Sequence, residues 1–318
     1  PLTITIGQSA PDTLLEDYVS RITKRTQIDG SSHAGYSPNS SDVTQGWNGS
    51  FGVHITPGFN FMSGSGHTLK GINVASVLLG GGEDGSQTTS VDITGSKIGY
   101  LELNNAHTDG VLVGGSTADS ANIIEQVVFK GSGNIIKGNH IGHDGTESLI
   151  SSDESIIDMN AGNTLDGNVI AGNANILMNF GSSDASGNTV INNHFGYLPW
   201  NNSSMGSSSA GIKLVEAENN EFSGNVIKFT NTNDQEAAIF VLDANDNTFY
   251  SNTISNNTGH GIHFSGSSTG NQFGAINSGN IVHDNSGWGV NFLVNTATGN
   301  PVSSNQIYNN TLGSIGNY

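Results

Sequence analysis

The most constraining feature of the sequence is a short phrase that recurs seven times between residues 133 and 307. It reads Gly or a polar residue, Asn, any residue, an apolar residue, two residues, then Asn, any residue and an apolar residue again. The second asparagine of successive copies follows at steps of 25 to 32 residues, at Asn139, Asn168, Asn193, Asn225, Asn252, Asn280 and Asn305. A repeat of this length is typical of stacked supersecondary units, each of which packs on its neighbours.

Within each copy the apolar residues alternate with a period of two, which predicts strands rather than helices. A third apolar strand follows most copies, as in Gly211–Leu214, Gly261–Phe264 and Gly289–Phe292. Three short strands in every repeat predict an all-β fold, a right-handed three-sheet parallel β-helix of about ten to eleven coils.

The recurring asparagines have a physical reason in such a stack. Equivalent residues of neighbouring coils lie about 4.8 Å apart. An asparagine amide carries both donors and an acceptor, so each amide can bond to those above and below. Asparagine also tolerates a left-handed backbone at a corner. We therefore expect the seven asparagines to form a structural ladder at the coil corners.

The N-terminal end follows a different pattern. Residues 2–6 alternate and predict a strand, and residues 9–22 predict a short helix with an apolar stripe and Pro11 in its first turn. A helix there would cover the open edge of the first coil. The expected division is an N-terminal strand and cap at 1–25 and a single elongated β-helix domain at 26–318.

Charge and composition exclude several partners. The chain has 9 Lys and Arg against 27 Asp and Glu, a formal charge of −18. Nucleic acid, anionic membranes and polyanionic glycans all favour a basic surface, so we expect none of them as a partner. There is no run of 18 apolar residues, so we expect no membrane insertion. The absence of cysteine suits an extracellular or cell-surface protein.

Aromatic and apolar residues provide the candidate binding positions. Trp47 lies in the long loop 35–50, and Tyr197 and Trp200 lie in the loop 197–210, where aromatic rings can stack on sugars or pack on their own loop. Strand alternation also places Leu112 and Phe240 on an outer wall, and we expect both on one sheet. Neighbouring exposed apolar residues form patches that bind partners, here glycans, other surface proteins or a second copy of the chain.

Two groups of residues are candidate metal ligands. His140, His143 and Asp144 form the densest cluster, and a His-X-X-His turn can bind a transition metal. The alternative is that both histidines are structural. The acidic glycine-rich stretch 81–85 offers oxygen ligands, so calcium is a candidate cofactor, although the fold requires none.

The stretches Thr26–Ser37, Gly138–Thr146 and Gly167–Asn173 resemble the repeats of secreted and surface-displayed bacterial right-handed parallel β-helix proteins rich in Asn and Gly. The resemblance covers most of residues 26–310. It implies the β-helix fold. It implies little about activity, because members of that family are mostly surface or secreted modules with no agreed activity.

We therefore expect a structural or adhesive β-helix module that self-assembles or binds glycans. This interpretation is favoured over an enzyme. One alternative is a glycan-active enzyme, a polysaccharide hydrolase or a phage-type depolymerase. Its carboxylates would line an acidic groove, and Asp153 with Glu154, or Asp243 with Asp246, are candidates. A second alternative is a filament subunit that stacks end to end through the open sheet edges. No catalytic residue is assigned.

Overall fold

The computed structural model describes residues 2–5, 20–22, 24–56, 58–61, 64–80, 88–104, 111–148, 155–207, 209–230, 237–293 and 299–317. The fold is the all-β parallel β-helix that the repeat predicts, with about nine turns instead of ten to eleven. The chain divides into two compact units, unit 1 (1–148) and unit 2 (149–318).

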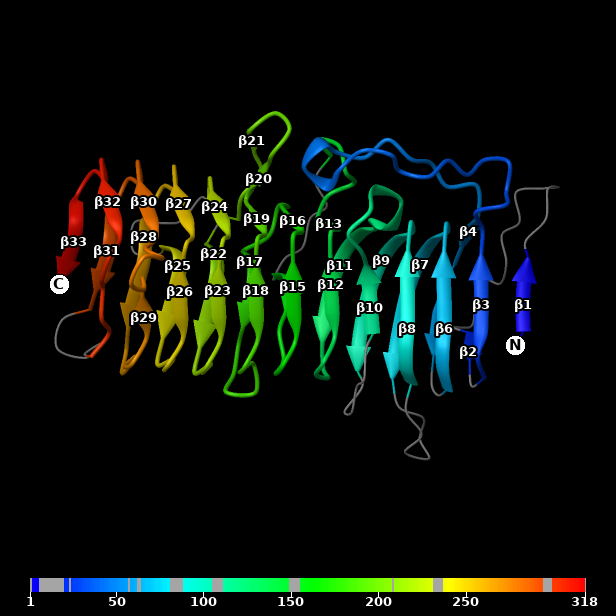
Figure 1. Ribbon diagram of the computed structural model, residues 1–318, viewed down its shortest axis with the longest axis horizontal. Helices are drawn as coiled ribbons and strands as arrows, with labels where there is room; N and C mark the ends of the chain where they lie inside the picture. Colours follow the sequence, from blue (N-terminus) through cyan, green and yellow to red (C-terminus); the bar gives the residue numbers. More distant parts are fainter. Residues whose placement is uncertain are drawn as a thin grey trace. The chain divides into compact units, whose positions relative to one another are not determined.

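The first sheet of unit 1 is entirely parallel, and its strands stand side by side in Figure 1. Its inward residues, such as Leu69, Ile93 and Val113, are fully buried. The outward residues between them are mostly polar, because strand alternation turns every second side chain to solvent. In order, the strands are β1 (Leu2–Thr5), β3 (Thr26–Asp29), β6 (Gly64–Lys70), β8 (Thr88–Thr94), β10 (Val111–Gly114) and β12 (Ile135–Lys137).

Three of the remaining strands of unit 1 are long, with seven or eight residues each. The long strands β7, β9 and β11 each take the place of two short strands of a coil. In each, two consecutive residues that are not buried interrupt the alternation, for example Gly99 and Tyr100. The strands are β2 (Ser20–Ile22), β4 (His54–Ile55), β5 (Phe59–Phe61), β7 (Asn73–Gly80), β9 (Lys97–Asn104), β11 (Ile123–Phe129) and β13 (His140–Ile141).

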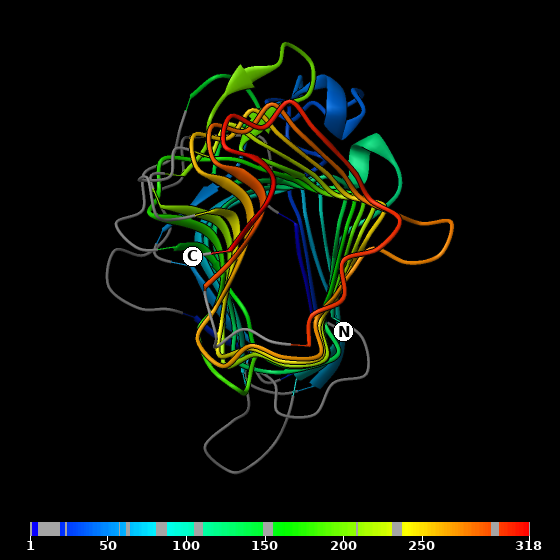
Figure 2. The same cartoon turned by 90° about the vertical axis from the view of Figure 1, so that its left-hand side faces the viewer.

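Most coils of unit 2 have three separate strands. The coils follow one outline when seen end-on in Figure 2. Its first sheet contains β15 (Thr164–Asp166), β18 (Thr189–Ile191), β23 (Glu221–Ser223), β26 (Thr248–Tyr250) and β29 (Gln272–Phe273). Its second contains β16 (Val169–Ile170), β19 (His194–Phe195), β24 (Val226–Lys228), β27 (Thr253–Ser255), β30 (Ile281–His283) and β32 (Gln306–Tyr308).

The third sheet of unit 2 contains β14 (Ser155–Asp158), β17 (Ile176–Phe180), β22 (Ala210–Val215), β25 (Ala237–Leu242), β28 (His260–Ser265), β31 (Trp288–Phe292) and β33 (Gly313–Asn317). An antiparallel hairpin, β20 (Tyr197–Leu198) and β21 (Ser203–Ser204), projects from one corner. The core is aromatic at its centre: Phe222 and Phe249 stack with ring centroids 4.9 Å apart. Both occupy the single inward slot that the repeat predicts.

Buried asparagines form hydrogen-bonded stacks along the corners. In unit 2 the side-chain Nδ2 of each asparagine donates to Oδ1 of the next, at 2.8 to 3.1 Å. The expected positions supply one stack, Asn168, Asn193, Asn225, Asn252, Asn280 and Asn305. Two further stacks run beside it, Asn188, Asn220, Asn247, Asn271 and Asn300, and Asn257, Asn285 and Asn310. In unit 1, Asn122 donates to Oδ1 of Asn139 at 2.9 Å.

The left-handed backbone at these corners belongs to the residue before the stacked asparagine. Asn193 follows Asn192 (φ 58°), Asn225 follows Gly224 (φ 65°), and the pattern recurs through the repeat. The two residues of each recurring Gly-Asn pair therefore have different roles. Glycine adopts the left-handed backbone conformation with little strain, and asparagine forms the hydrogen bonds of the stack. The expectation that the ladder asparagines are themselves left-handed is wrong.

The N-terminal cap differs from its expectation where it is described. Residues 20–22, the end of the expected helix 9–22, form strand β2 and pair with β5. The rest of that helix lies outside the described residues. The helices among the described residues are two 3-10 turns, Val43–Gln45 and Ala118–Ser120.

Candidate functional site

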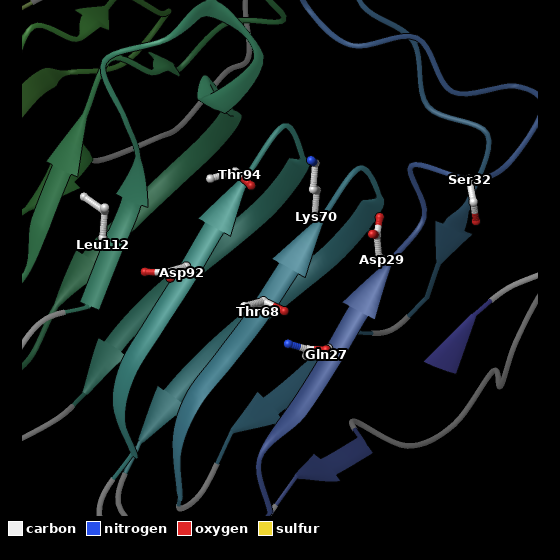
Figure 3. Close-up of a pocket in the computed structure, with 8 residues that line it drawn as sticks. All are labelled: Gln27, Asp29, Ser32, Thr68, Lys70, Asp92, Thr94 and Leu112. Carbon is white, nitrogen blue, oxygen red and sulfur yellow. The ribbon is translucent and has the colours of Figure 1, made fainter. Parts of the chain in front are cut away.

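A hollow of about 630 Å³ lies on the outer face of the first sheet of unit 1 (Figure 3). We call it the groove. Three strands and the loop after β3 supply its polar residues, and a fourth strand supplies an apolar one. Its lining residues are Gln27 and Asp29 on β3, Ser32 after β3, Thr68 and Lys70 on β6, Asp92 and Thr94 on β8, and Leu112 on β10.

Parallel register arranges these side chains in two columns across the strands. Gln27 pairs with Thr68, Thr68 with Asp92, and Asp92 with Leu112. Asp29 pairs with Lys70, and Lys70 with Thr94, in the second column. Neighbouring members of a column are about 4.8 Å apart, which is the strand spacing. The groove is therefore a regular array of amide, hydroxyl, carboxylate and ammonium groups.

The polar groups of this array are available to a ligand. Within the described part of the chain, the side chains of Gln27, Thr68, Lys70 and Asp92 form no hydrogen bond or ion pair with the protein. Asp29 uses one carboxylate oxygen to accept from the N–H of Ser31, at 2.8 Å. In unit 2 some outward groups bond to each other: Tyr250 donates to Glu221 and Asn192 to Asp166.

The loop 31–50, which we call the strap, borders the upper end of the groove and contributes Ser32. It runs along the coil corners of unit 1 in Figure 1. Tyr36 lies over two corner glycines, because a Cβ on Gly71 would come within 3.0 Å of its ring and one on Gly95 within 2.9 Å of its hydroxyl. Burial raises the pKa of Tyr36, with Asp119 and Asp29 adding to the effect, so the phenol stays neutral.

The far end of the strap is held by Trp47. Its backbone N–H donates to the carbonyl of Gly145 at 2.8 Å, and its ring stacks on Phe51 with centroids 5.5 Å apart. Its indole N–H donates to the carbonyl of Gly49. Trp47 thus packs on its own loop and its base, which is the structural alternative to a sugar-stacking role.

Leu112 and Phe240 lie on different sheets. The prediction that one outer sheet contains both residues is therefore wrong. β10 pairs with β8 and β12 in the first sheet of unit 1, whereas β25 belongs to the third sheet of unit 2. Alternation predicts correctly that both point outward and are partly exposed. The ring of Phe240 packs edge-on to His263, with centroids 5.5 Å apart.

The loop 197–210 forms the β20–β21 hairpin, and its aromatic residues are less exposed than expected. Tyr197 is 6 % exposed and shares a hydrogen bond of 2.6 Å with Nδ1 of His194. The ammonium of Lys228 lies 4.8 Å from the centre of its ring. Burial raises the pKa of Tyr197 to about 12. Trp200, at the turn, is partly buried.

The expected metal ligands do not form a ligand set. His140 and His143 are fully buried with ring centroids 5.2 Å apart, and Trp47 packs edge-on to His140. Burial, and then the neighbouring His143, hold the pKa of His140 well below its ordinary value. Asp144 accepts from Thr146 in a turn. Among the described residues no three His, Cys, Asp or Glu side chains gather to hold a metal.

The other acidic candidates are turn residues or lie outside the described residues. Asp243 and Asp246 occupy left-handed corner positions, with φ of 51° and 54°. Asp243 accepts from the N–H of Ser267. Asp153 and Glu154, and the calcium candidate 81–85, lie outside the described residues.

The groove residues Gln27, Thr68, Lys70 and Asp92 were not singled out from the sequence. Alternation is present in each strand and identifies these residues as outward, but the repeat is irregular before residue 133. The sequence therefore does not show which of these strands pair or in which register, and of the groove residues it indicates only Leu112.

Comparison with known proteins gives a match at the level of fold. The family described as right handed beta helix region matches residues 199–318. No curated protein matches the sequence. Dettilon tailspike protein has a similar structure at a TM-score of 0.49 and 16 % identity, over 99 % of this chain and 60 % of that one. The chain thus spans less than two thirds of the tailspike.

Two epimerases are similar to the same degree. The periplasmic alginate epimerase AlgG gives a TM-score of 0.49 and 14 % identity, over 92 % of this chain and 68 % of that one. The A-module of a mannuronan C-5 epimerase from Azotobacter vinelandii gives 0.49 and 10 %, over 92 % and 82 %. Within the described residues no helix is long and apolar enough to cross a membrane.

Proposed function

We propose that the chain is an extracellular, adhesive β-helix module that binds a neutral glycan in the groove of unit 1. The observation that carries this proposal is the open hydrogen-bonding array of the groove, in which the side chains of Gln27, Thr68, Lys70 and Asp92 form no hydrogen bond or ion pair within the described part of the chain. Sugars present hydroxyl groups in many directions, and a rigid array of donors and acceptors matches them without a change of shape.

Charge restricts the class of glycan. The groove contains two carboxylates, Asp29 and Asp92, and one ammonium, Lys70, on a chain of formal charge −18. A polyuronate or sulfated chain would meet repulsion both in the groove and at longer range. A neutral saccharide pays no such cost, and carboxylates are strong acceptors for its hydroxyls.

A glycan array tests the proposal with a matched pair of variants. Thr68→Val removes one groove hydroxyl and keeps the side-chain shape. Thr189→Val makes the same change at an outward, partly exposed position of the first sheet of unit 2. A hydrogen bond contributes about 0.5–1.5 kcal/mol, so Thr68→Val should weaken binding by about two- to tenfold. Equal affinity for both variants, or no glycan bound at all, would reject the groove as the site.

An enzyme acting on a neutral glycan is the second candidate, and one observation favours it. Asp29 and Asp92 line the same groove on β3 and β8, with β6 between them. Glycosidases place two carboxylates on either side of the scissile bond, one as acid and one as base or nucleophile. Release of reducing sugar that Asp92→Asn abolishes, while binding is retained, would favour hydrolysis over adhesion.

A further inference from the structure

The outward residues of the first sheet of unit 1 change from polar to apolar along the stack of coils. In the column that begins at Gln27, the outward residues of β3, β6 and β8 are polar. The next two strands carry Leu112 and Ile135, which are register partners on β10 and β12. Ile135 is 39 % exposed and extends the apolar surface one strand beyond the groove.

Single exposed apolar residues need no explanation, but this pair is continuous with a polar hollow. Ligand sites characteristically combine an apolar surface with a few placed polar groups that fix orientation. In Figure 3 Leu112 lies at one end of the groove and Asp29 and Ser32 at the other. Asp92 stands beside Leu112, so an acceptor for a hydroxyl and an apolar surface lie about one strand spacing apart.

We infer that the groove selects a saccharide that carries an exocyclic methyl group, with that methyl against Leu112 and Ile135 and the adjacent hydroxyls on Asp92 and Thr68. The inference rests on the proposed function and adds the feature by which the groove discriminates among neutral glycans. Two kinds of sugar present this chemistry, a 6-deoxyhexose through its C6 methyl and an N-acetylated hexosamine through its acetyl methyl.

The size of the selection follows from the area of one methyl group. Burial of a methyl or methylene contributes about 0.8 kcal/mol, which is about a fourfold gain in affinity. A sugar that places a hydroxymethyl group there instead must bring a hydroxyl against the apolar side chains of Leu112 and Ile135. That desolvation raises the selection above fourfold.

Two pairs of probes test the inference by titration calorimetry. The first compares galactose oligosaccharides with their 6-deoxygalactose counterparts, and the second compares glucose oligosaccharides with their N-acetylglucosamine counterparts. The proteins are the parent chain, Leu112→Asn, Ile135→Thr and a control, Ile191→Thr. Ile191 is also an outward, partly buried isoleucine on a first sheet, that of unit 2.

The expected result is a preference of about fourfold or more for the methyl-bearing member of one pair in the parent chain. Leu112→Asn and Ile135→Thr should remove this preference with little change in affinity for the unmethylated member, and Ile191→Thr should keep it. Glycan binding with no preference in either pair, or a preference that survives both groove substitutions, would overturn the inference and leave the proposed function standing. No binding of any glycan would overturn both.

Discussion

The side-chain amide of Asn225 donates to Oδ1 of Asn252 at 3.0 Å, while its own Oδ1 accepts from the backbone N–H and the amide of Asn193. The same amide also donates to the carbonyl of Val190 at 2.8 Å. One residue thus satisfies groups of three residues in the two neighbouring coils. Because all of these groups are buried, the asparagine stack is a condition for closing the corners of the coils.

We expect Asn225→Leu to destabilise the fold by about 3 kcal/mol or more. The leucine removes the acceptor of the buried backbone N–H of Asn193 and a donor to the carbonyl of Val190, and each unsatisfied group costs about 1–3 kcal/mol. The midpoint of urea unfolding measures the change. Asn201→Leu, at an exposed position of the β20–β21 hairpin, is the control and should shift stability by less than about 1 kcal/mol. Similar midpoints for both variants would contradict this account of the corners.

A pair of glycine substitutions separates backbone strain from steric contact. Gly167 has φ of 65°, and a Cβ there would meet nothing within 4 Å. Gly196 has φ of 80°, and its Cβ would lie 2.1 Å from the carbonyl oxygen of Lys228. We expect Gly167→Ala to cost about 1–2 kcal/mol, the left-handed penalty alone. Gly196→Ala should cost clearly more, because backbone must move, and thermal unfolding that ranks the two equally would refute this.

The buried His260 predicts a loss of stability in weak acid. Burial, and then the neighbouring His263, lower its pKa to about 4 from the ordinary 6.5. Its Nδ1 accepts from the N–H of Trp288 at 2.9 Å, which requires an unprotonated nitrogen. Between pH 6.5 and 4 the unfolded chain therefore binds a proton that the native chain does not, so this contribution is complete above pH 6.5 and is lost as pH falls toward 4.

Urea unfolding of the parent chain and His260→Gln at pH 7 and pH 4.5 measures this contribution. Stability of the parent should fall more steeply over that interval than stability of the variant, because glutamine does not titrate. Parallel losses in the two proteins would show that His260 does not carry the effect.

We expect no cleavage of pectate, alginate or hyaluronan. Elimination in polyuronates needs cations to neutralise the carboxylate and a base to remove a proton, and the groove offers a single ammonium beside two carboxylates. Ultraviolet absorbance of an unsaturated product is the measurement. Its appearance with any of the three substrates would overturn the charge argument.

The regular part of the sequence predicted the fold well, because its period of two fixes which side chains point inward. Phe222, Phe249 and Ile254 occupy the slots assigned to them and are fully buried. The repeat also placed the first asparagine stack. It did not predict the other two, although the first Asn of each phrase supplies one of them, because the choice of which residue turns the corner depends on backbone geometry.

The groove was less predictable for a physical reason. Alternation shows that Asp92 and Leu112 point outward, but it does not say which strands become neighbours. The pattern predicts Leu112 and Phe240 on one sheet, whereas the register partners of β10 are on β8 and β12. The burial of Tyr197 could not be predicted either. It depends on the β20–β21 hairpin and on the contact with His194, and the sequence pattern predicts neither.

The most direct test of the central claim is a crystal structure of the chain with the best-bound neutral oligosaccharide from the glycan array. The account predicts sugar density on the outer face of the first sheet of unit 1, with hydroxyls on Thr68 and Asp92 and an apolar group against Leu112. Sugar bound elsewhere on the chain, with the groove filled only by water, would contradict it.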